Sequence, residues 1–283
     1  MENILIANKE KLETLKENFA KQGKDKIHIL TDFDNTLTCA FVNGEKVPSI
    51  ISVLRDGSYL TPDYAEKAHG LYDKYHPFEN DPNILKEEKK RLMEEWWTVH
   101  FELLIKLGLN KKDVEKAIDS EKIKFRGGFF EFIDFLKEKN IPLIIMSSSG
   151  LGEESISLKL EKENKLYNNV YIISNSFKWD ENGKAISIRT PIIHGANKDE
   201  TLVKDFPEIF KAVKNRKNVL LIGDSLDDTG MVEGFDYDNL IKIGFLNEQT
   251  EEKLEKYEKV FDIILLNDSG MKYINKLISE IIL

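Results

Sequence analysis

The ten residues Ile29-Leu-Thr-Asp32-Phe-Asp34-Asn-Thr36-Leu-Thr38 form the most informative stretch of this chain. An apolar, β-favouring run leads directly into two aspartates that are two positions apart. Because alternate residues of a strand point the same way, Asp32 and Asp34 can both emerge near the carboxyl end of one strand. Two like charges there cost free energy unless a cation or a shared proton offsets their repulsion. The pair therefore indicates either a nucleophile beside an acid/base group, with a metal, or an ordinary strand exit with solvated carboxylates.

Composition sets the broad class of the protein. A chain of 283 residues is long for one compact core, so we expect one domain with a large insertion or two domains. A hydrophobic content of 41% with 32% charged residues is typical of a soluble globular protein. The net charge of -9 argues against binding to a nucleic-acid polymer, which requires a basic surface. The single cysteine, Cys39, excludes internal disulfides and a cysteine-rich metal site.

The sequence also sets expectations for location and for the N-terminal segment. No apolar stretch approaches the length of a membrane span, and charges are scattered through residues 1–26, so we expect a cytoplasmic protein without a membrane partner. A monomer is the default expectation. An apolar spacing predicts an amphipathic helix near the N-terminus, formed by Leu5, Leu12, Leu15 and Phe19.

Short apolar runs alternate with helix-sized segments along much of the chain. This alternation predicts an α/β fold with a central parallel sheet and covering helices. The strand-sized runs are Ile27–Leu30, Ile141–Met146, Val170–Ile173, Val219–Ile222, Ile241–Phe245 and Ile263–Leu266. Residues 179–184, Trp-Asp-Glu-Asn-Gly-Lys, carry a tight-turn signal and predict a β-hairpin.

The pattern changes between residues 47 and 120, where helices follow one another without a convincing strand. We expect helices over Pro62–Tyr75, Pro82–Leu107 and Lys111–Ile118, the last capped by Asn110. We therefore divide the chain into a discontinuous α/β core of residues 1–46 and 121–283, and a mainly helical insertion of residues 47–120.

Several predicted strands deliver polar residues to one edge of the sheet, where open α/β folds place their sites. The strand after Pro142 leads into Ser147-Ser148-Ser149-Gly150-Leu-Gly152, whose hydroxyls and amides suit phosphate oxygens, although a plain helix-start loop has the same composition. Lys198 stands at an apparent helix start. The run from Val219 ends in a carboxylate cluster of Asp224, Asp227 and Asp228. Hard oxygen ligands of this kind suit Mg²⁺.

Four motifs occur in the order in which they occur in the haloacid dehalogenase (HAD) superfamily of phosphohydrolases. They are Asp32-x-Asp34-x-Thr36, a serine after a strand, Lys198, and Gly223-Asp224-Ser-x-x-Asp228, and together they span about 200 residues. The chain more closely resembles the cytosolic pyrimidine 5′-nucleotidase branch of that superfamily. Further segments support this resemblance: Asp32–Thr38, Glu79–Pro82, Glu95–Trp97, Ser174–Asn175, Asn197–Lys198 and Lys242–Asn247.

The resemblance implies a Rossmann-like HAD core and a role for each motif. Asp32 would be the nucleophile and would form an aspartyl-phosphate, and Asp34 would be the general acid and base. Mg²⁺ would be held by the Asp32 carboxylate, the Asp34 main-chain carbonyl and Asp224. Phosphate would be bound by Lys198, by amides of the Gly150–Gly152 turn and by one serine. Counting from Pro142 selects Ser147, whereas counting back from Gly150 selects Ser148; we favour Ser147, because the strand fixes position better than a loop does. Asp228 would orient Lys198 or a metal-bound water, and Asp227 would be a solvated neighbour.

By the same resemblance the insertion would be a cap that selects the substrate. Glu79 matches the family glutamate that accepts hydrogen bonds from the nucleobase. Trp96 and Trp97 lie about 100° apart on a helix, so we expect Trp96 to pack inside the cap and Trp97 to stack on the base. Asn175 is expected to contact the sugar or base near the hinge. Core or surface roles are expected for four histidines without metal-ligand spacing: His69, His76, His100 and His194.

These expectations combine into a Mg²⁺-dependent 5′-nucleotidase that acts on pyrimidine nucleoside monophosphates such as CMP and UMP. One alternative is a 7-methylguanosine monophosphate phosphatase of the same family, because the indole of Trp97 could stack on that cationic base. Another alternative is a broad phosphomonoesterase. The non-enzyme alternative, a nucleotide-binding protein without catalysis, gives no reason for the chain to carry Asp32, Asp34, Lys198 and Asp224 together.

Overall fold

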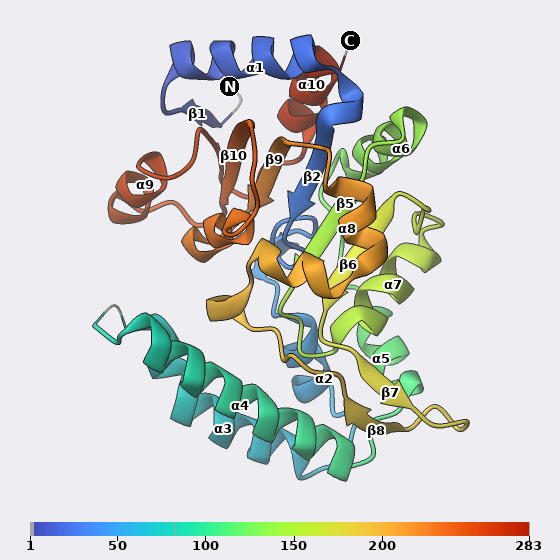
Figure 1. The fold of residues 1–283 in the computed structure, drawn as a ribbon. Coiled ribbons are helices and arrows are strands. Elements are labelled where there is room, and N and C mark those ends of the chain that lie inside the picture. The colour runs from blue at the N-terminus through green and yellow to red at the C-terminus, as the bar shows by residue number, and fades with distance from the viewer. Residues whose placement is uncertain (1–2, 82, 283) are drawn as a thin grey trace.

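The computed structural model describes residues 3–81 and 83–282 and contains one large sheet (Figure 1). Its strands lie in the order β1, β11, β10, β9, β2, β5, β6. Neighbouring strands from β11 to β6 are parallel, and β1 is antiparallel to β11, which confirms the predicted α/β class. The bounds are β1 (Ile4–Ile6), β2 (Ile27–Thr31), β5 (Leu143–Ser147), β6 (Val170–Ser174), β9 (Asn218–Gly223), β10 (Asn239–Leu246) and β11 (Ile263–Leu266).

Alternate strand residues pack into two hydrophobic clusters on opposite faces of the sheet. In β2, Ile29 belongs to one cluster and Leu30 to the other. The larger cluster takes in α1 (Lys9–Gln22), α6 (Phe129–Lys139), α7 (Gly152–Lys162) and α10 (Lys272–Ile281), and it extends into the segment 47–120 through residues such as Ile50 and Phe101. The other face is covered by α8 (Pro207–Val213) and two 3-10 segments, η3 (Glu200–Asp205) and η4 (Leu226–Val232). Both faces of the parallel strands are therefore buried, which explains their continuous apolar sequences.

The N-terminal prediction is wrong at its start. Leu5 lies in β1, opposite Ile264 of β11, and α1 begins only after Asn8. The side-chain oxygen of Asn8 accepts a hydrogen bond from the amide of Lys11 at 3.0 Å, so Asn8 caps the helix. The backbone groups of residues 4–6 form hydrogen bonds with β11 at the edge of the sheet. The spacing of apolar residues does not show such pairing, so it predicted a helix there.

The described part of residues 47–120 forms α2 (Ile50–Asp56), α3 (Tyr64–Asn80), α4 (Lys86–Lys106) and α5 (Lys111–Ile118). Figure 1 shows α3 and α4 as a long adjacent pair beyond the carboxyl ends of the sheet strands, with α2 between that pair and the core. The prediction for α5 is confirmed together with its Asn110 cap, whose oxygen accepts a hydrogen bond from the Lys112 amide at 3.0 Å. The division of the chain into core and insertion stays a prediction.

Two helices of the insertion differ from their predicted bounds. α3 continues through Pro77 to Asn80, past the predicted end at Tyr75. A proline removes one helical hydrogen bond and disfavours the helix before it, but does not always end it. The predicted start of the next helix, Pro82, lies outside the described residues, and α4 begins at Lys86. α2 was not predicted, because seven residues carry too little periodicity.

The remaining elements are short. β3 (Phe41–Val42) and β4 (Glu45–Lys46) form one hairpin, and β7 (Phe177–Trp179) and β8 (Ala185–Ile188) form the predicted second hairpin. Also present are η1 (Lys24–Lys26), η2 (Gly195–Asn197) and α9 (Glu251–Glu258). Lys198 follows η2 and precedes η3, so it lies between two 3-10 turns and not at the start of an α-helix as expected. Among the described residues, no helix is long and apolar enough to cross a membrane.

Candidate active site

The carboxyl ends of three adjacent strands, β5, β2 and β9, open into a cavity of about 360 Å³. Asp32 follows β2, Ser147 ends β5 and Asp224 follows β9. Parallel neighbours place these ends at one edge, so residues far apart in sequence meet there. The cavity is lined by most of the predicted site residues: Asp32, Asp34, Glu79, Trp97, Ser147, Ser148, Gly150, Lys198, Asp224 and Asp228.

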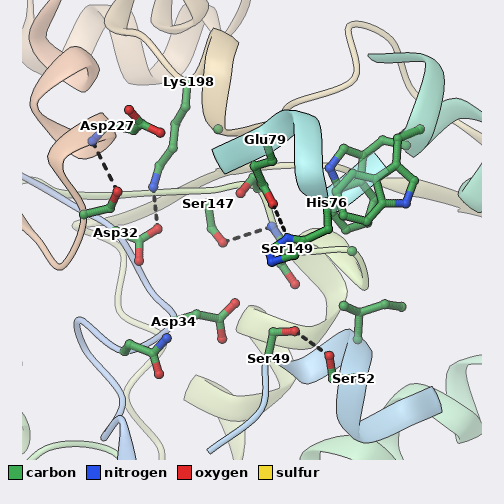
Figure 2. A pocket seen from close by; sticks show the side chains of 18 of the residues that line it. Asp32, Asp34, Ser49, Ser52, His76, Glu79, Ser147, Ser149, Lys198 and Asp227 are labelled. Atoms are coloured by element: carbon green, nitrogen blue, oxygen red, sulfur yellow. Dashed lines mark hydrogen bonds and ion pairs between the residues drawn. The ribbon is translucent and has the colours of Figure 1, made fainter. Parts of the chain in front are cut away.

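Lys198 is held between two buried aspartates. Its ammonium donates hydrogen bonds to Asp32 and, at 2.8 Å, to Asp228 Oδ1 (Figure 2 shows the contact with Asp32). The three residues are 5–8% exposed. Burial by itself lowers the pKa of Lys198, but the attraction of Asp228 and Asp32 outweighs it and raises the pKa above its ordinary value. The lysine therefore stays charged and fixed beside Asp32.

Asp34 lines the cavity and is half-buried there. Burial, followed by repulsion from Asp32, raises the pKa of Asp34 to about 7. Burial also raises the pKa of Asp32, to about 6, although Lys198 opposes that shift. Of these two carboxyls, Asp34 has the higher pKa, which is the order that a proton donor beside a carboxylate requires.

Three carboxylates cluster closely enough to hold a cation. Oxygens of Asp32, Asp224 and Asp228 all lie within 4.8 Å of one another. Burial and repulsion from Asp228 and Asp32 raise the pKa of Asp224 well above its ordinary value, so the described protein charges alone do not neutralise it. Hard oxygen donors with excess negative charge fit a divalent cation such as Mg²⁺.

Within this cluster, Asp228 differs from the other two carboxylates. Its Oδ2 accepts hydrogen bonds from the amides of Asp224 and Ser225, at 3.0 and 2.9 Å, while Oδ1 accepts from Lys198. Asp224 instead accepts from Thr36 Oγ1 at 3.3 Å and from Asn247 Nδ2 at 3.5 Å. Because both oxygens of Asp228 already have partners, its geometry favours orienting Lys198. Asp227 is exposed at the cavity rim.

The serine turn after β5 lies beside the carboxylates. Ser147 is buried and its Oγ accepts a hydrogen bond from the Ser149 amide at 3.1 Å, as Figure 2 shows, whereas Ser148 is half-buried. Both serines line the cavity, so the choice between them stays open. Gly150 has no room for a side chain, because a Cβ there would lie 2.7 Å from Trp97 Cζ3.

Asn175 does not enter the cavity, which corrects the expectation of a sugar or base contact. It is 1% exposed, and its amide nitrogen donates to the carbonyls of Ser149 and Ile193, at 3.2 and 2.9 Å. Its oxygen accepts from the Ile193 amide at 2.9 Å. Asn175 therefore fastens the segment before Lys198 to the serine turn, and its hydrogen-bonding groups are occupied by main chain.

The far end of the cavity is built by α3 and α4. Glu79 Oε2 lies 3.0 Å from His76 Nδ1, and the Tyr72 ring stacks on His76 with centroids 4.3 Å apart (Figure 2 shows the Glu79–His76 contact). Trp96 packs with Tyr75 and Met93 inside the insertion, as expected. However, Trp96 also lines the cavity.

The two indoles stack on each other with centroids 5.6 Å apart, and Trp97 stacks on His100 at 5.6 Å. Trp96 and Trp97 thus reach the same cavity even though their helix positions point apart. An indole extends far from its Cα, so the direction of the Cα–Cβ bond alone does not place the ring.

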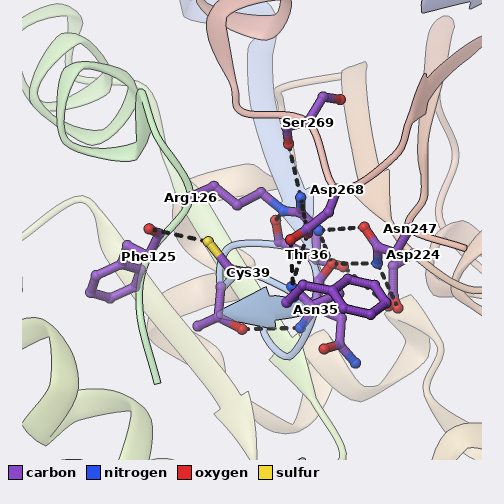
Figure 3. A network of polar contacts seen from close by, with 12 residues as sticks. Asn35, Thr36, Cys39, Phe125, Arg126, Asp224, Asn247, Asp268 and Ser269 are labelled. Carbon is purple, nitrogen blue, oxygen red and sulfur yellow. Dashed lines mark hydrogen bonds and ion pairs between the residues drawn. The ribbon is translucent and has the colours of Figure 1, made fainter. Parts of the chain in front are cut away.

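Arg126 links the loop after Asp34 to Asn247, which follows β10, and to Asp268, which lies after β11 (Figure 3). It donates to the Thr36 carbonyl at 2.7 Å, to the Asn35 carbonyl, and to Asn247 Oδ1 at 2.7 Å. It also pairs with Asp268 at 2.8 Å. Asn247 in turn donates to Asn35 O at 3.0 Å and approaches Asp224. This network fixes Asp224 relative to the Asp32–Thr36 loop.

Sequence reasoning did not single out Arg126, Arg55, Tyr72, Ser49 or Ser52. A buried arginine within the apolar run Phe125-Arg126-Gly-Gly-Phe-Phe was a usable signal, since such a charge needs partners. The others depended on α2 or on a side-chain position that the spacing did not predict. Cys39 lies outside the cavity, with Sγ 3.6 Å from the Phe125 carbonyl, and burial raises the pKa of its thiol.

Comparison with known proteins places this architecture. A family model described as pyrimidine 5′-nucleotidase (UMPH-1) matches residues 35–282. A 7-methylguanosine phosphate-specific 5′-nucleotidase of Gallus gallus is 32% identical, over 93% of this chain and 90% of that protein. A putative cytosolic 5′-nucleotidase 3 of Caenorhabditis elegans is 31% identical, over 99% of this chain and 76% of that protein.

Solved structures agree with the sequence relatives. The crystal structure of cytosolic 5′-nucleotidase IIIB bound to cytidine matches with a TM-score of 0.89 and 28% identity, covering 99% of this chain and 94% of that one. A phospho-aspartyl intermediate analogue of phosphoserine phosphatase matches with a TM-score of 0.52 and 20% identity, covering 89% and 98%. A HAD family hydrolase also matches, with a TM-score of 0.55. The matches to this hydrolase and to phosphoserine phosphatase show that the fold is that of the HAD superfamily.

Proposed function

The chain belongs to the pyrimidine 5′-nucleotidase (UMPH-1) family and is a phosphoric monoester hydrolase, and from this premise we propose that it hydrolyses CMP and UMP in a Mg²⁺-dependent reaction. The observation that carries the proposal is the meeting of Asp32, Lys198 and Asp224 in a cavity whose other end is lined by Trp97 and Glu79. One end suits a phosphate with a cation, and the other suits a flat ring with a donor edge.

Asp32 is the proposed nucleophile. Lys198 engages Oδ1, which leaves Oδ2 to attack phosphorus in line with the ester oxygen. As the Asp32–phosphorus bond forms, the bond from phosphorus to O5′ breaks. Asp34 gives its proton to O5′, so the nucleoside leaves neutral. A pKa of about 7 keeps a large fraction of Asp34 protonated at neutral pH.

The second half of the reaction uses the same residues in reverse roles. Asp34, now a carboxylate, takes a proton from a water molecule whose oxygen attacks phosphorus. The bond between phosphorus and Asp32 breaks, inorganic phosphate leaves and the Asp32 carboxylate is restored. Splitting one displacement into two in this way avoids direct attack of water on the ester.

Charge neutralisation supports both steps. Lys198, one of the two serines and the Gly150 amide would bind the non-bridging phosphate oxygens. Asp32, Asp224 and the main-chain carbonyl of Asp34 would hold Mg²⁺, which when bound neutralises phosphate charge. Asp228 keeps Lys198 in place through their 2.8 Å hydrogen bond.

We also propose that residues 47–120 act as a cap over this site, and that the protein is located in the cytoplasm. Glu79 would accept a hydrogen bond from an exocyclic amino group, and Trp97 would stack on the base. Asn175 is left out of this assignment, because its side chain is bonded to main chain.

A second candidate substrate is 7-methylguanosine monophosphate. It is favoured by the names of several relatives, 29–33% identical to this chain, and by the presence of the Trp97 indole in the cavity lining. The cytidine bound to the similar cytosolic 5′-nucleotidase IIIB supports the pyrimidine candidate.

Phosphate release from CMP, UMP, AMP, GMP, 7-methyl-GMP and a sugar phosphate, with Mg²⁺ or with EDTA, tests the proposal. We expect Mg²⁺-dependent turnover of CMP and UMP above the purines and the sugar phosphate. Asp32→Asn should abolish turnover while nucleotide binding remains. Equal turnover of every ester would overturn the assignments of Glu79 and Trp97, and full activity of D32N would overturn the covalent route.

A further inference from the structure

Arg55 of α2 is a cation of the cavity that the proposed reaction does not use. Its side chain is only 15% exposed, and Nε donates to Asp56 Oδ1 at 2.9 Å. Within residues 3–81 and 83–282, Nη1 and Nη2 have no hydrogen-bond acceptor from the protein. A guanidinium offers five N–H groups in a fixed fork, so its terminal nitrogens can donate to paired acceptors of a bound molecule. The two terminal nitrogens are thus available to a molecule in the cavity.

Arg55 belongs to the nucleobase end of the cavity. Its guanidinium carbon lies 5.8 Å from the centroid of the Tyr72 ring, and Tyr72 stacks on His76, which contacts Glu79. A continuous row of groups therefore joins Arg55 to the residue expected to bind the base. Burial is the main cause that lowers the pKa of His100, and the positive charge of Arg55 lowers it further. Arg55 therefore acts electrostatically on a residue that lines the cavity.

We propose that Arg55 is a specificity-determining residue, which donates hydrogen bonds to acceptor atoms of a neutral nucleobase and disfavours a base with a permanent positive charge. The inference rests on the proposed function of the cavity as a nucleoside monophosphate site. Glu79 and Arg55 then form a complementary pair, one accepting and one donating along the base edge. Cytosine offers an amino group together with ring acceptors, so it can satisfy both.

A 7-methylated guanine meets this end of the cavity differently. Methylation removes the N7 acceptor and gives the ring a positive charge, which Arg55 repels. Glu79 and the indoles attract the same charge, so the balance depends on how far water screens each group. The Glu79 side chain is 40% exposed and already contacts His76, whereas Arg55 is more deeply buried. Asp56, 47% exposed, offsets the Arg55 charge only through a partly solvated contact.

Binding of nucleosides, which lack the phosphate, isolates this end of the cavity. Quenching of Trp96 and Trp97 fluorescence reports the dissociation constants of cytidine and 7-methylguanosine for wild type, Arg55→Met, Arg55→Lys and Arg91→Met. Arg91 is an exposed arginine of α4 outside the cavity, so R91M controls for the loss of one positive charge from the insertion. R55K keeps the charge and the fold while it removes the planar fork.

We expect R55M to weaken cytidine binding about 10-fold to 100-fold and to leave 7-methylguanosine bound at least as tightly as in wild type. R55K should weaken cytidine binding but still disfavour 7-methylguanosine, and R91M should change neither. An equal change for both nucleosides in R55M, or no change, would overturn the inference and leave Arg55 a packing residue.

Kinetics separate this outcome from a failure of the proposed function. The ratio of kcat/KM for CMP over 7-methyl-GMP should fall about tenfold or more in R55M, mainly through KM. If wild type binds cytidine but hydrolyses neither nucleotide, the proposed function fails while the role of Arg55 is still decided by binding. If wild type binds neither nucleoside, the inference is overturned.

Discussion

Lys198 and Asp228 form a buried ion pair with 2.8 Å between Nζ and Oδ1. The same aspartate accepts main-chain hydrogen bonds from the residue that follows β9 and from Ser225, so it links the lysine to the Asp224 turn. Asp228 therefore joins the turn after β9 to Lys198, which lies in the loop before η3, and holds the lysine ammonium in position.

This connection predicts the effect of Asp228→Asn. The amide keeps the shape of the side chain but loses the charge that holds Lys198. We expect kcat to fall about 10-fold to 100-fold, and the free energy of unfolding to fall by about 1–3 kcal/mol. Steady-state phosphate release and urea unfolding measure the two effects. Asp227→Asn, an exposed neighbour, is the matched control and should change stability by less than about 0.5 kcal/mol. Equal behaviour of the two variants would contradict the role of Asp228.

The carboxylate cluster predicts a metal effect that can be measured without turnover. Binding of Mg²⁺ to the folded protein alone should stabilise it, by about 1.4 kcal/mol at ten times the dissociation constant. Asp224→Asn should remove this stabilisation, because it removes one of the charges that face the cation. Thermal unfolding with Mg²⁺ or EDTA measures the difference, with D227N again as control. A Mg²⁺-induced shift that persists in D224N would place the cation elsewhere.

His100 predicts a pH dependence of stability. Burial, followed by the charge of Arg55, lowers its pKa to about 4, and its Nε2 lies 3.1 Å from the Tyr64 hydroxyl. The unfolded chain binds this proton near pH 6.5, so the contribution of His100 is fully present above pH 6.5 and is lost as the pH falls toward 4. Between those values it should fall by about 1.4 kcal/mol per pH unit.

The raised pKa values of Asp32 and Asp34 act in the opposite direction over the same range, so the wild-type slope alone does not isolate His100. Comparison of wild type with His100→Gln isolates the contribution of His100, because both proteins contain Asp32 and Asp34. The difference in unfolding free energy between wild type and H100Q, measured by urea titration from pH 7 to pH 4.5, should shrink as the pH falls. A difference that is independent of pH would show that His100 titrates normally in the folded protein.

The sequence predicted the sheet and the strand ends that carry Asp32 and Asp224, because both depend on local rules. Buried parallel strands require continuous apolar runs, and a strand that ends in a carboxylate places it at the site edge. Asn110 capped its helix as expected, since capping needs only neighbouring residues. Contacts that depend on packing could not be predicted in this way. Asn175 was expected at the substrate, but its side chain is hydrogen-bonded to the main chain of Ser149 and Ile193.

Arg55 illustrates the same limit at the base end. It lies in a helix too short to show periodicity, and only the approach of α2 to α3 places it beside Tyr72. In the proposed function, recognition of the base thus depends on contacts between helices of residues 47–120, whereas the phosphate chemistry depends on residues at strand ends.

Gly150, at the phosphate end of the cavity, lies against Trp97 of the base end, so a substitution there tests how the two ends depend on each other. An alanine Cβ at this position would lie 2.7 Å from Trp97 Cζ3 and 3.0 Å from Ile51 Cβ, so the indole must move. We expect Gly150→Ala to raise KM for CMP about 10-fold with a smaller change in kcat, because stacking on the base is worth about 1–3 kcal/mol. Gly195→Ala is the matched control: Gly195 also lines the cavity, but its Cβ would meet no atom within 4 Å. Steady-state kinetics and tryptophan emission spectra measure the outcome, and an unchanged KM in G150A would remove Trp97 from base recognition.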